Sequence, residues 1–192
     1  MQQAVARWVQ NYWPVSVEFI QSSDRGFGIE NGYHEPGRLG ADRWVAMIAA
    51  RARFEEAVCI ADCGTALTVD VVDADGRHRG GVICPGVRLM QEALICGTEK
   101  LSFEGVRPDA ILGRNTGAGI ASGTLNAAAG LIEKIFDEAR QSIDARIKLV
   151  ITGGDAGAVA ARLQIESEHI PDLVLNGLAV IDRDKCASEE KW

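Results

Sequence analysis

Apolar and polar positions follow clear periods along most of the chain, and these periods predict alternating helices and strands. In residues 41–57 the apolar positions recur at helical spacing, and Asp42 stands in the first turn, where the helix dipole favours a carboxylate. Residues 57–61 are continuously apolar, which is typical of a strand buried on both faces. Residues 67–84 alternate around the pair Asp75-Gly76, so they predict a hairpin.

The other segments extend this pattern toward both ends. We expect helices at 1–13, 87–101, 116–142 and 155–163, strands at 15–20 and 148–154, and a short strand turning into a last helix within 169–181. The helix from Thr116 contains four glycines, each unfavourable by about 1 kcal/mol relative to alanine, so we expect close packing against it. The order of elements from residue 57 indicates an α/β domain with a mixed sheet.

Composition narrows the possible classes of protein. A chain of 192 residues with 47% hydrophobic content can form one ordinary domain or two small ones, and its net charge of −7 argues against a general binder of nucleic acid or of anionic membranes. No signal-like N-terminus and no apolar run of about 20 residues occurs, so we expect a cytoplasmic protein without membrane contact. The five cysteines lack CxxC spacing and are interpreted as reduced structural thiols.

Two turns carry polar groups directly after apolar strands. In IADCGTALTVD (60–70), backbone N–H groups and the Thr65 hydroxyl could hold phosphate oxygens, and Asp62 could bind a cation that bridges phosphates. In ITGGDA (151–156), paired glycines would let a base or ribose lie against the backbone. Taken singly, each segment fits an ordinary turn equally well.

Four segments in the same order resemble the type III pantothenate kinase family, which belongs to the acetate and sugar kinase, Hsp70 and actin superfamily. They are NGYHEPGRLGADRW (31–44), ADCGTALTVDVVDADGRHRGGVICPG (61–86), NTGAGIASG (115–123) and ITGGDA. The resemblance spans about residues 15–181. It implies an α/β fold of the actin-like, ribonuclease H-like ATPase type with two similar domains. It also divides the chain into the remainder of a first domain (1–56), a second domain (57–183) and a polar tail (184–192).

The resemblance implies a cytoplasmic homodimer that transfers the γ-phosphoryl of ATP to pantothenate, the first step of coenzyme A biosynthesis. Asp42 falls on the catalytic carboxylate, which accepts the proton of the attacking hydroxyl. Asp62 falls on the ligand of an activating monovalent cation, K⁺ or NH₄⁺. The positions that match substrate contacts are Tyr33, Gly40, Ala41, Asp42, Arg43 and Thr116, and those that match contacts of ATP, used with Mg²⁺, are Gly64, Thr65, Gly153 and Gly154.

Two of these residues have further readings. Arg43 could hold an anionic group through a forked contact of its guanidinium. Thr116, which the family delivers near the dimer interface, fits the N-cap of the following helix at least as well by spacing.

One segment departs from the family pattern. Family members begin with a strand that carries an Asp-x-Gly-Asn phosphate loop, and residues 1–30 contain no match to it. The first domain therefore looks truncated at its N-terminus, and we expect the chain as written to bind ATP poorly and to be impaired as a kinase. The alternative hypothesis is a non-catalytic homologue that binds a ligand or a partner as a regulatory accessory factor.

Overall fold

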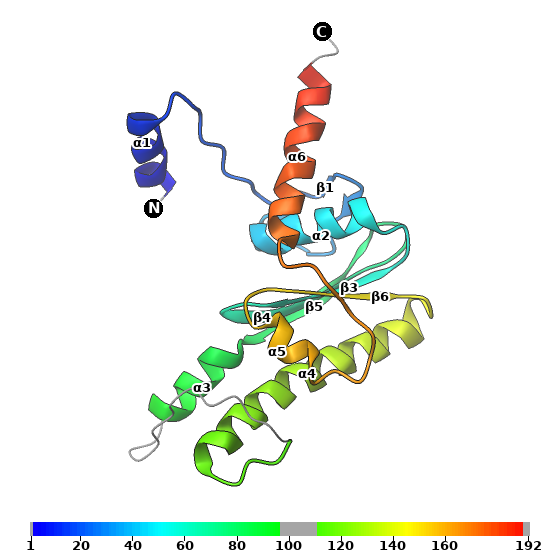
Figure 1. The fold of residues 1–192 in the computed structure, drawn as a ribbon. Coiled ribbons are helices and arrows are strands. Elements are labelled where there is room, and N and C mark those ends of the chain that lie inside the picture. Colours follow the sequence, from blue (N-terminus) through cyan, green and yellow to red (C-terminus); the bar gives the residue numbers. More distant parts are fainter. Residues whose placement is uncertain (1, 97–110, 190–192) are drawn as a thin grey trace.

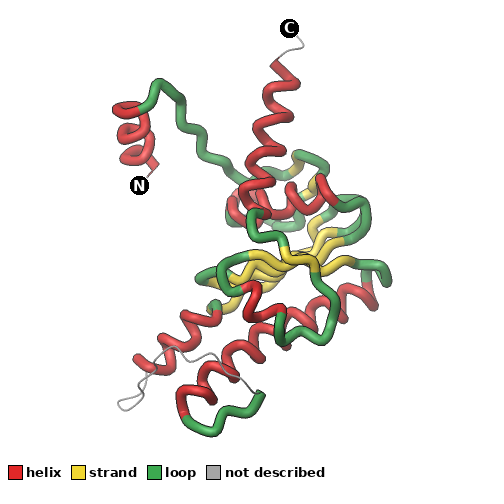
Figure 2. Tube along the Cα trace, in the orientation of Figure 1, coloured by secondary structure: helices red, strands yellow, loops and turns green. Residues whose placement is uncertain are grey.

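A computed structural model describes residues 2–96 and 111–189 and contains a five-stranded sheet between two layers of helices (Figure 1, Figure 2). The strand order is β5-β4-β3-β6-β7, with β5, β4 and β3 antiparallel and β6 and β7 added in parallel to β3. The strands are β3 (Val58–Cys63), β4 (Ala66–Val72), β5 (His78–Pro85), β6 (Lys148–Thr152) and β7 (Glu168–His169). The predicted mixed sheet and its hairpin are confirmed.

Helices cover both faces of this sheet. One face packs against α3 (Val87–Cys96), α4 (Thr116–Ser142) and α5 (Ala156–Ala160). The other packs against α2 (Ala41–Arg53) and α6 (Leu173–Glu189). Helix α6 continues into the segment expected as a polar tail, as far as Glu189. Since α2 precedes the predicted boundary near Glu56 yet lies on the sheet that follows it, the domain division stays a prediction.

The pleat of β3 explains why its sequence is apolar throughout. Cys59 and Ala61 point into the core shared with α4, while Val58 and Ile60 point into the core shared with α2. Strand β4 sends Leu67, Val69 and Val71 toward α4, so its intervening residues face α2. This arrangement brings polar positions of β3 and β4 under helix α2.

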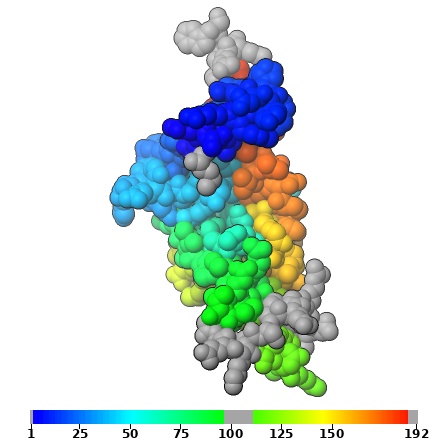
Figure 3. Space-filling model, turned by 90° about the vertical axis from the view of Figure 1, so that its left-hand side faces the viewer, coloured from blue at the N-terminus to red at the C-terminus, as the bar shows by residue number. Residues whose placement is uncertain are grey.

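The N-terminal region differs from the prediction. Helix α1 (Gln2–Tyr12) forms as expected but buries none of its residues, and it stands apart from the sheet in two perpendicular views (Figure 1, Figure 3). Residues 15–20 were predicted as a strand and this is wrong, because they pair with no other strand and alternation alone does not hold a strand. A small hairpin of β1 (Arg25–Gly26) and β2 (Ile29–Glu30) follows.

Three further expectations concern α4, the cysteines and membranes. A Cβ at Gly119, Gly123 or Gly130 would have no atom of the described part of the chain within 4 Å, so that part does not supply the expected packing against these three positions. All five cysteines are free, and burial raises the pKa of Cys59 and Cys63 to about 12. Within residues 2–96 and 111–189, no helix has the length and apolar character needed to cross a bilayer.

Candidate active site

The first turn of α2 presents Asp42 to solvent. Gly40 precedes the helix with φ −57° and ψ 136°, and a Cβ there would lie 2.5 Å from the Asp42 Oδ1, so the absence of a side chain leaves room for this carboxylate. The Asp42 Oδ1 accepts a hydrogen bond from the Arg43 backbone N–H at 2.8 Å. Ala41 and Asp42 are both exposed, so a reactant can reach this carboxylate from solvent.

A second carboxylate lies under this turn. Asp62 is the fifth residue of β3 and is paired in register with Thr152, the last residue of the parallel strand β6. Burial, and after it the negative charge of Asp42, raise the pKa of Asp62. The two aspartates therefore share one edge of the sheet, where two negative charges converge.

Glycine-rich turns surround Asp62. Gly153 has a φ of 95°, and a Cβ there would come within 2.6 Å of both the Asp62 Oδ1 and the Cys63 carbonyl. Only glycine fits this position without displacing the carboxylate. Gly64 lies on the other side, where a Cβ would be 3.5 Å from the same oxygen. Gly154 has open space beside it. These glycines keep the strand ends uncovered.

The turn from β3 to β4 places Thr65 at the same edge. Thr65 is exposed, and its carbonyl accepts a hydrogen bond from the Gly86 N–H at 2.9 Å, which ties the turn to the end of β5. The structure thus gathers five predicted residues, Asp62, Gly64, Thr65, Gly153 and Gly154, at the carboxyl ends of β3 and β6. Open α/β sheets bind ligands at such ends.

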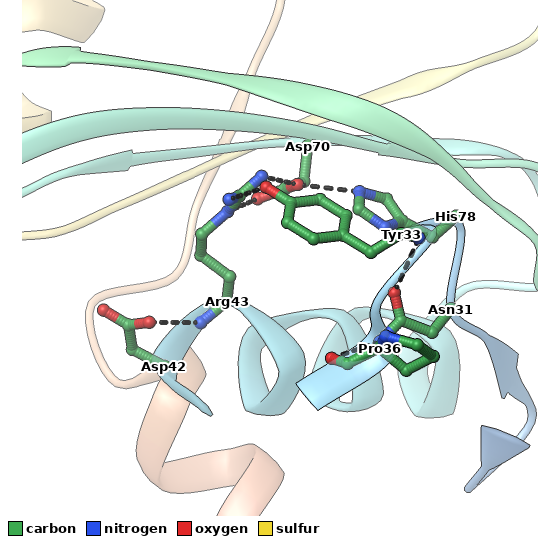
Figure 4. Close-up of polar contacts among 7 residues, drawn as sticks. All are labelled: Asn31, Tyr33, Pro36, Asp42, Arg43, Asp70 and His78. Atoms are coloured by element: carbon green, nitrogen blue, oxygen red, sulfur yellow. Dashed lines mark hydrogen bonds and ion pairs between the residues drawn. The ribbon is translucent and has the colours of Figure 1, made fainter. Parts of the chain in front are cut away.

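Arg43 points into the interior instead of toward this edge (Figure 4). Its Nε donates to the Asp70 Oδ2 at 2.7 Å and its Nη2 donates to the Asp70 Oδ1 at 2.5 Å, and both side chains are at most 6% exposed. The fork that we expected to hold a ligand is therefore used by Asp70. The third guanidinium nitrogen, Nη1, donates to the Tyr33 hydroxyl at 2.7 Å.

Tyr33 is positioned by the loop that leads to α2, which includes the short helix η1 (Pro36–Arg38). The buried Asn31 donates from its amide to the carbonyls of Ser23 and Pro36, and its Oδ1 accepts from the Tyr33 backbone N–H at 3.0 Å. The loop is thereby folded around one amide side chain. Its Tyr33 ring stacks on His78, with ring centroids 5.8 Å apart (Figure 4).

Thr116 lies elsewhere. It begins α4, on the face of the sheet opposite α2 (Figure 1). The N-cap is not Thr116 but Asn115, whose side chain accepts from the Ala118 N–H at 2.8 Å. The N-cap reading of Thr116 is therefore wrong, and the structure does not bring Thr116 together with Asp42.

Three residues of this region were not predicted: Asn31, Asp70 and His78. Asp70 stands at a polar position of an alternating strand, which by sequence alone reads as solvent-facing. Only the path of α2 across that face shows that it is buried. The same path makes His78, the first residue of β5, a partner of Asp70.

A cavity of about 800 Å³ lies at the opposite ends of the strands and contains none of the predicted site residues. Its basic side chains are each within 4.0 Å of a carboxylate, in the pairs Arg140–Asp137, Arg146–Asp144 and Lys148–Glu56. Its charges are thus compensated locally. In the described part of the chain, no three His, Cys, Asp or Glu side chains cluster as a metal site would require.

Comparisons with solved structures identify the fold. The chain resembles a protein from Campylobacter jejuni described as a Baf family transcriptional activator, with a TM-score of 0.57 and 23% identity over 83% of this chain and 70% of that one. It also resembles the activator of 2-hydroxyisocaproyl-CoA dehydratase from Clostridium difficile, solved with ADPNP, with a TM-score of 0.50 and 15% identity over 83% and 72%. The predicted α/β class with an actin-like ATPase fold is confirmed.

Sequence comparisons identify the family. The family model described as type III pantothenate kinase matches residues 1–138. The type III pantothenate kinase of Nitrosococcus oceani is 39% identical over 185 residues, covering 93% of this chain and 69% of that protein. That of Halorhodospira halophila is 41% identical over 170 residues, covering 88% and 67%. The chain thus spans about two thirds of the length of these curated relatives. It belongs to the type III pantothenate kinase family.

Proposed function

We propose that this chain acts as a pantothenate kinase, which transfers the γ-phosphoryl of ATP to the primary hydroxyl of pantothenate and yields 4'-phosphopantothenate. Family membership supports the reaction. The observation that carries the proposal is the meeting of Asp42 and Asp62 at the glycine-lined strand ends, where the charge of Asp42 contributes to the raised pKa of Asp62. An exposed carboxylate that can accept the hydroxyl proton, beside turns that can hold phosphate oxygens, is what phosphoryl transfer to a hydroxyl requires.

Asp42 is the proposed general base. Its carboxylate is exposed and fixed at one oxygen by the Arg43 N–H, which leaves the other oxygen to accept the proton of the pantothenate hydroxyl as that hydroxyl attacks. Gly40 and Ala41 line the approach to this oxygen and add no bulky side chain. Asp42 thus acts on the nucleophile, while the strand-end turns act on the phosphates.

The strand-end turns are the proposed ATP contacts. The backbone N–H groups around Gly64, Thr65, Gly153 and Gly154 would hold phosphate oxygens and the nucleoside, since no side chain at the glycines blocks the approach. Mg²⁺ bound with ATP neutralises phosphate charge. Asp62 would hold a monovalent cation, K⁺ or NH₄⁺, and the convergence of its charge with that of Asp42 favours such an occupant.

Tyr33 is proposed to line the pantothenate site, with the buried guanidinium of Arg43 behind it. Because Asp70 occupies the guanidinium fork, Arg43 contributes to the site through its position and its positive charge and makes no forked contact with the ligand. Thr116 would come from a second copy of the chain, because it lies on the opposite face of the sheet from Asp42. The open side of Gly119, Gly123 and Gly130 supports α4 as the surface of a cytoplasmic homodimer.

The test measures ADP release in a coupled assay with and without pantothenate, together with pantothenate affinity by calorimetry. We expect ADP release that depends on pantothenate and is reduced in Asp42→Asn. The matched control is Glu35→Gln. Glu35 is an exposed carboxylate in the loop before α2, and among the described residues it pairs only with Arg38. Pantothenate binding without any ADP release would instead support the accessory, non-catalytic role.

A further inference from the structure

Four side chains, each from a different part of the fold, form one buried polar network behind the proposed active site (Figure 4). Arg43 comes from α2, Tyr33 from the loop before it, and Asp70 and His78 from neighbouring strands. The Asp70 Oδ1 accepts from the Arg43 Nη2 at 2.5 Å and lies 2.8 Å from the His78 Nε2. Because an ionised carboxylate is only an acceptor, the His78 Nε2 is the donor in this contact. Asp70 is therefore held from two sides.

The charge of Asp70 is stabilised within the chain. Burial alone would raise the pKa of this carboxyl, but hydrogen bonds from His78 and Arg43 outweigh burial and lower it. The same pair keeps Arg43 charged, since burial alone would lower its pKa and Asp70 more than offsets this. The network is thus a fixed ion pair to which His78 adds one donor.

The surrounding backbone leaves room for the pair. A Cβ at Gly81 in β5 would lie 2.3 Å from the Asp70 Oδ1 and 2.6 Å from the Arg43 Nη2. Any side chain there would force the ion pair apart. Gly81 therefore leaves room for the ion pair, and this role is independent of turn formation.

His78 is an unfavourable choice for stability alone. Its side chain is 0% exposed, and its Nδ1 is buried without a hydrogen-bond partner in the described part of the chain. An unpartnered buried polar atom is destabilising, whereas an apolar side chain at the same place would avoid this loss. The histidine is explained by what its Nε2 does for Asp70 and by the stacking of its ring on Tyr33.

We propose that Asp70 and His78 are positioning residues that hold Arg43 and Tyr33, and through Arg43 the first turn of α2, in the geometry that binds pantothenate. This inference rests on the proposed function. Arg43 follows Asp42 directly, and its backbone N–H donates to the Asp42 carboxylate. A shift of the Arg43 side chain is therefore passed to the proposed base. Misplacement by about 1 Å can lower a rate on the order of 10².

Two substitutions of His78 separate its two contacts. His78→Gln can place an amide N–H near the position of Nε2 and so retain the donor to Asp70. His78→Phe retains a ring that can stack on Tyr33 and loses that donor. We expect kcat/KM for pantothenate to fall about 10- to 100-fold in His78→Phe and to stay within about threefold of the wild type in His78→Gln. The KM for ATP should stay within about threefold in both.

The controls keep the outcome decisive. Arg77→Ala removes an exposed side chain of the same hairpin and should leave both constants unchanged. If thermal unfolding shows that His78→Phe is not folded, His78→Asn replaces it, since its amide reproduces Nδ1 and does not reach Asp70. Wild-type kinetics in a folded Phe or Asn variant would overturn the inference. A wild-type protein with no pantothenate-dependent ADP release would overturn the proposed function instead, and calorimetric pantothenate affinity would still test the role of His78.

Discussion

Asp62 and Asp70 lie on neighbouring strands and face the same helix, yet the structure treats them in opposite ways. Consecutive residues of α2 meet them: Asp42 adds a negative charge near Asp62, and Arg43 adds a positive charge to Asp70. The pKa of Asp62 is raised and that of Asp70 is lowered. The negative charges at the edge around Asp62 therefore have no positive partner in the described part of the chain, whereas the charge of Asp70 is paired with Arg43. The difference separates a region suited to bind from a region suited to position.

The largest effect should come from breaking the interior pair. Arg43→Met leaves the Asp70 carboxylate buried with His78 as its remaining described partner, and the loss of one partner of a buried ion pair is destabilising by about 3–5 kcal/mol. Urea unfolding of Arg43→Met measures this. Arg25→Met, in the exposed pair Arg25–Glu30, is the control and should change the free energy of unfolding by no more than about 1 kcal/mol. Equal effects of the two substitutions would remove the distinction between interior and edge.

The next effect concerns catalysis at the edge. Asp42→Asn should lower kcat by about 10² or more, because the amide cannot accept the proton of the hydroxyl. Its free energy of unfolding should be no lower than that of the wild type, since the Asp42 side chain is exposed, the amide oxygen can still accept from Arg43, and the loss of the negative charge relieves Asp62. Unchanged turnover in the coupled assay would remove Asp42 from the mechanism.

The cation requirement sharpens the role of Asp62. We expect ADP release to be lost when potassium is replaced by sodium or by a bulky organic cation, because the paired negative charges at Asp42 and Asp62 then lack a fitting counterion. Titrating potassium back should restore the rate. In Asp62→Asn the rate should be low at every potassium concentration, and a normal potassium response of this variant would argue against Asp62 as the ligand.

The smallest effect is on stability as a function of pH. The raised pKa of Asp62 means that its ionised form destabilises the folded state, an effect absent below the ordinary value of 3.8 and complete above the raised folded value. In potassium-free buffer, Asp62→Asn should therefore be more stable than the wild type at pH 7 and should lose this advantage as the pH falls toward 3.8. If the urea unfolding curves of the wild type and of Asp62→Asn coincide at both pH values, ionised Asp62 does not destabilise the folded state.

Much of the fold followed from local pattern. The period of α2, the continuous apolar run of β3 and the turn pair in the β4–β5 hairpin each report a local constraint, and all three formed as expected. The segment 15–20 failed because a strand requires a partner, which no alternation within six residues can reveal. The sequence also led us to expect impaired kinase activity, because residues 1–30 contain no Asp-x-Gly-Asn phosphate loop, and this expectation stays a prediction.

The candidate site divides in the same way. The turns around Asp62 could be predicted from the sequence because glycine and short polar side chains are typical of turns. Asp70 and His78 were not, because a polar residue in an alternating strand is interpreted as exposed, and its burial depends on where α2 crosses the sheet. The assignment of Arg43 to the substrate site stays a prediction, but the guanidinium fork that we expected to hold a ligand is occupied by Asp70. Arg43 and Asp70 are 27 residues apart in the sequence, so their contact can be identified only from the tertiary structure.

The most direct test follows the phosphoryl group itself. The protein is incubated with ATP labelled in the γ-phosphoryl, Mg²⁺, potassium and pantothenate, and the products are separated by chromatography and identified by mass. We predict label on the primary hydroxyl of pantothenate in the wild type and in Glu35→Gln, with about 10² less in Asp42→Asn. Label on pantothenate to the same extent in folded Asp42→Asn and in the wild type would contradict the account.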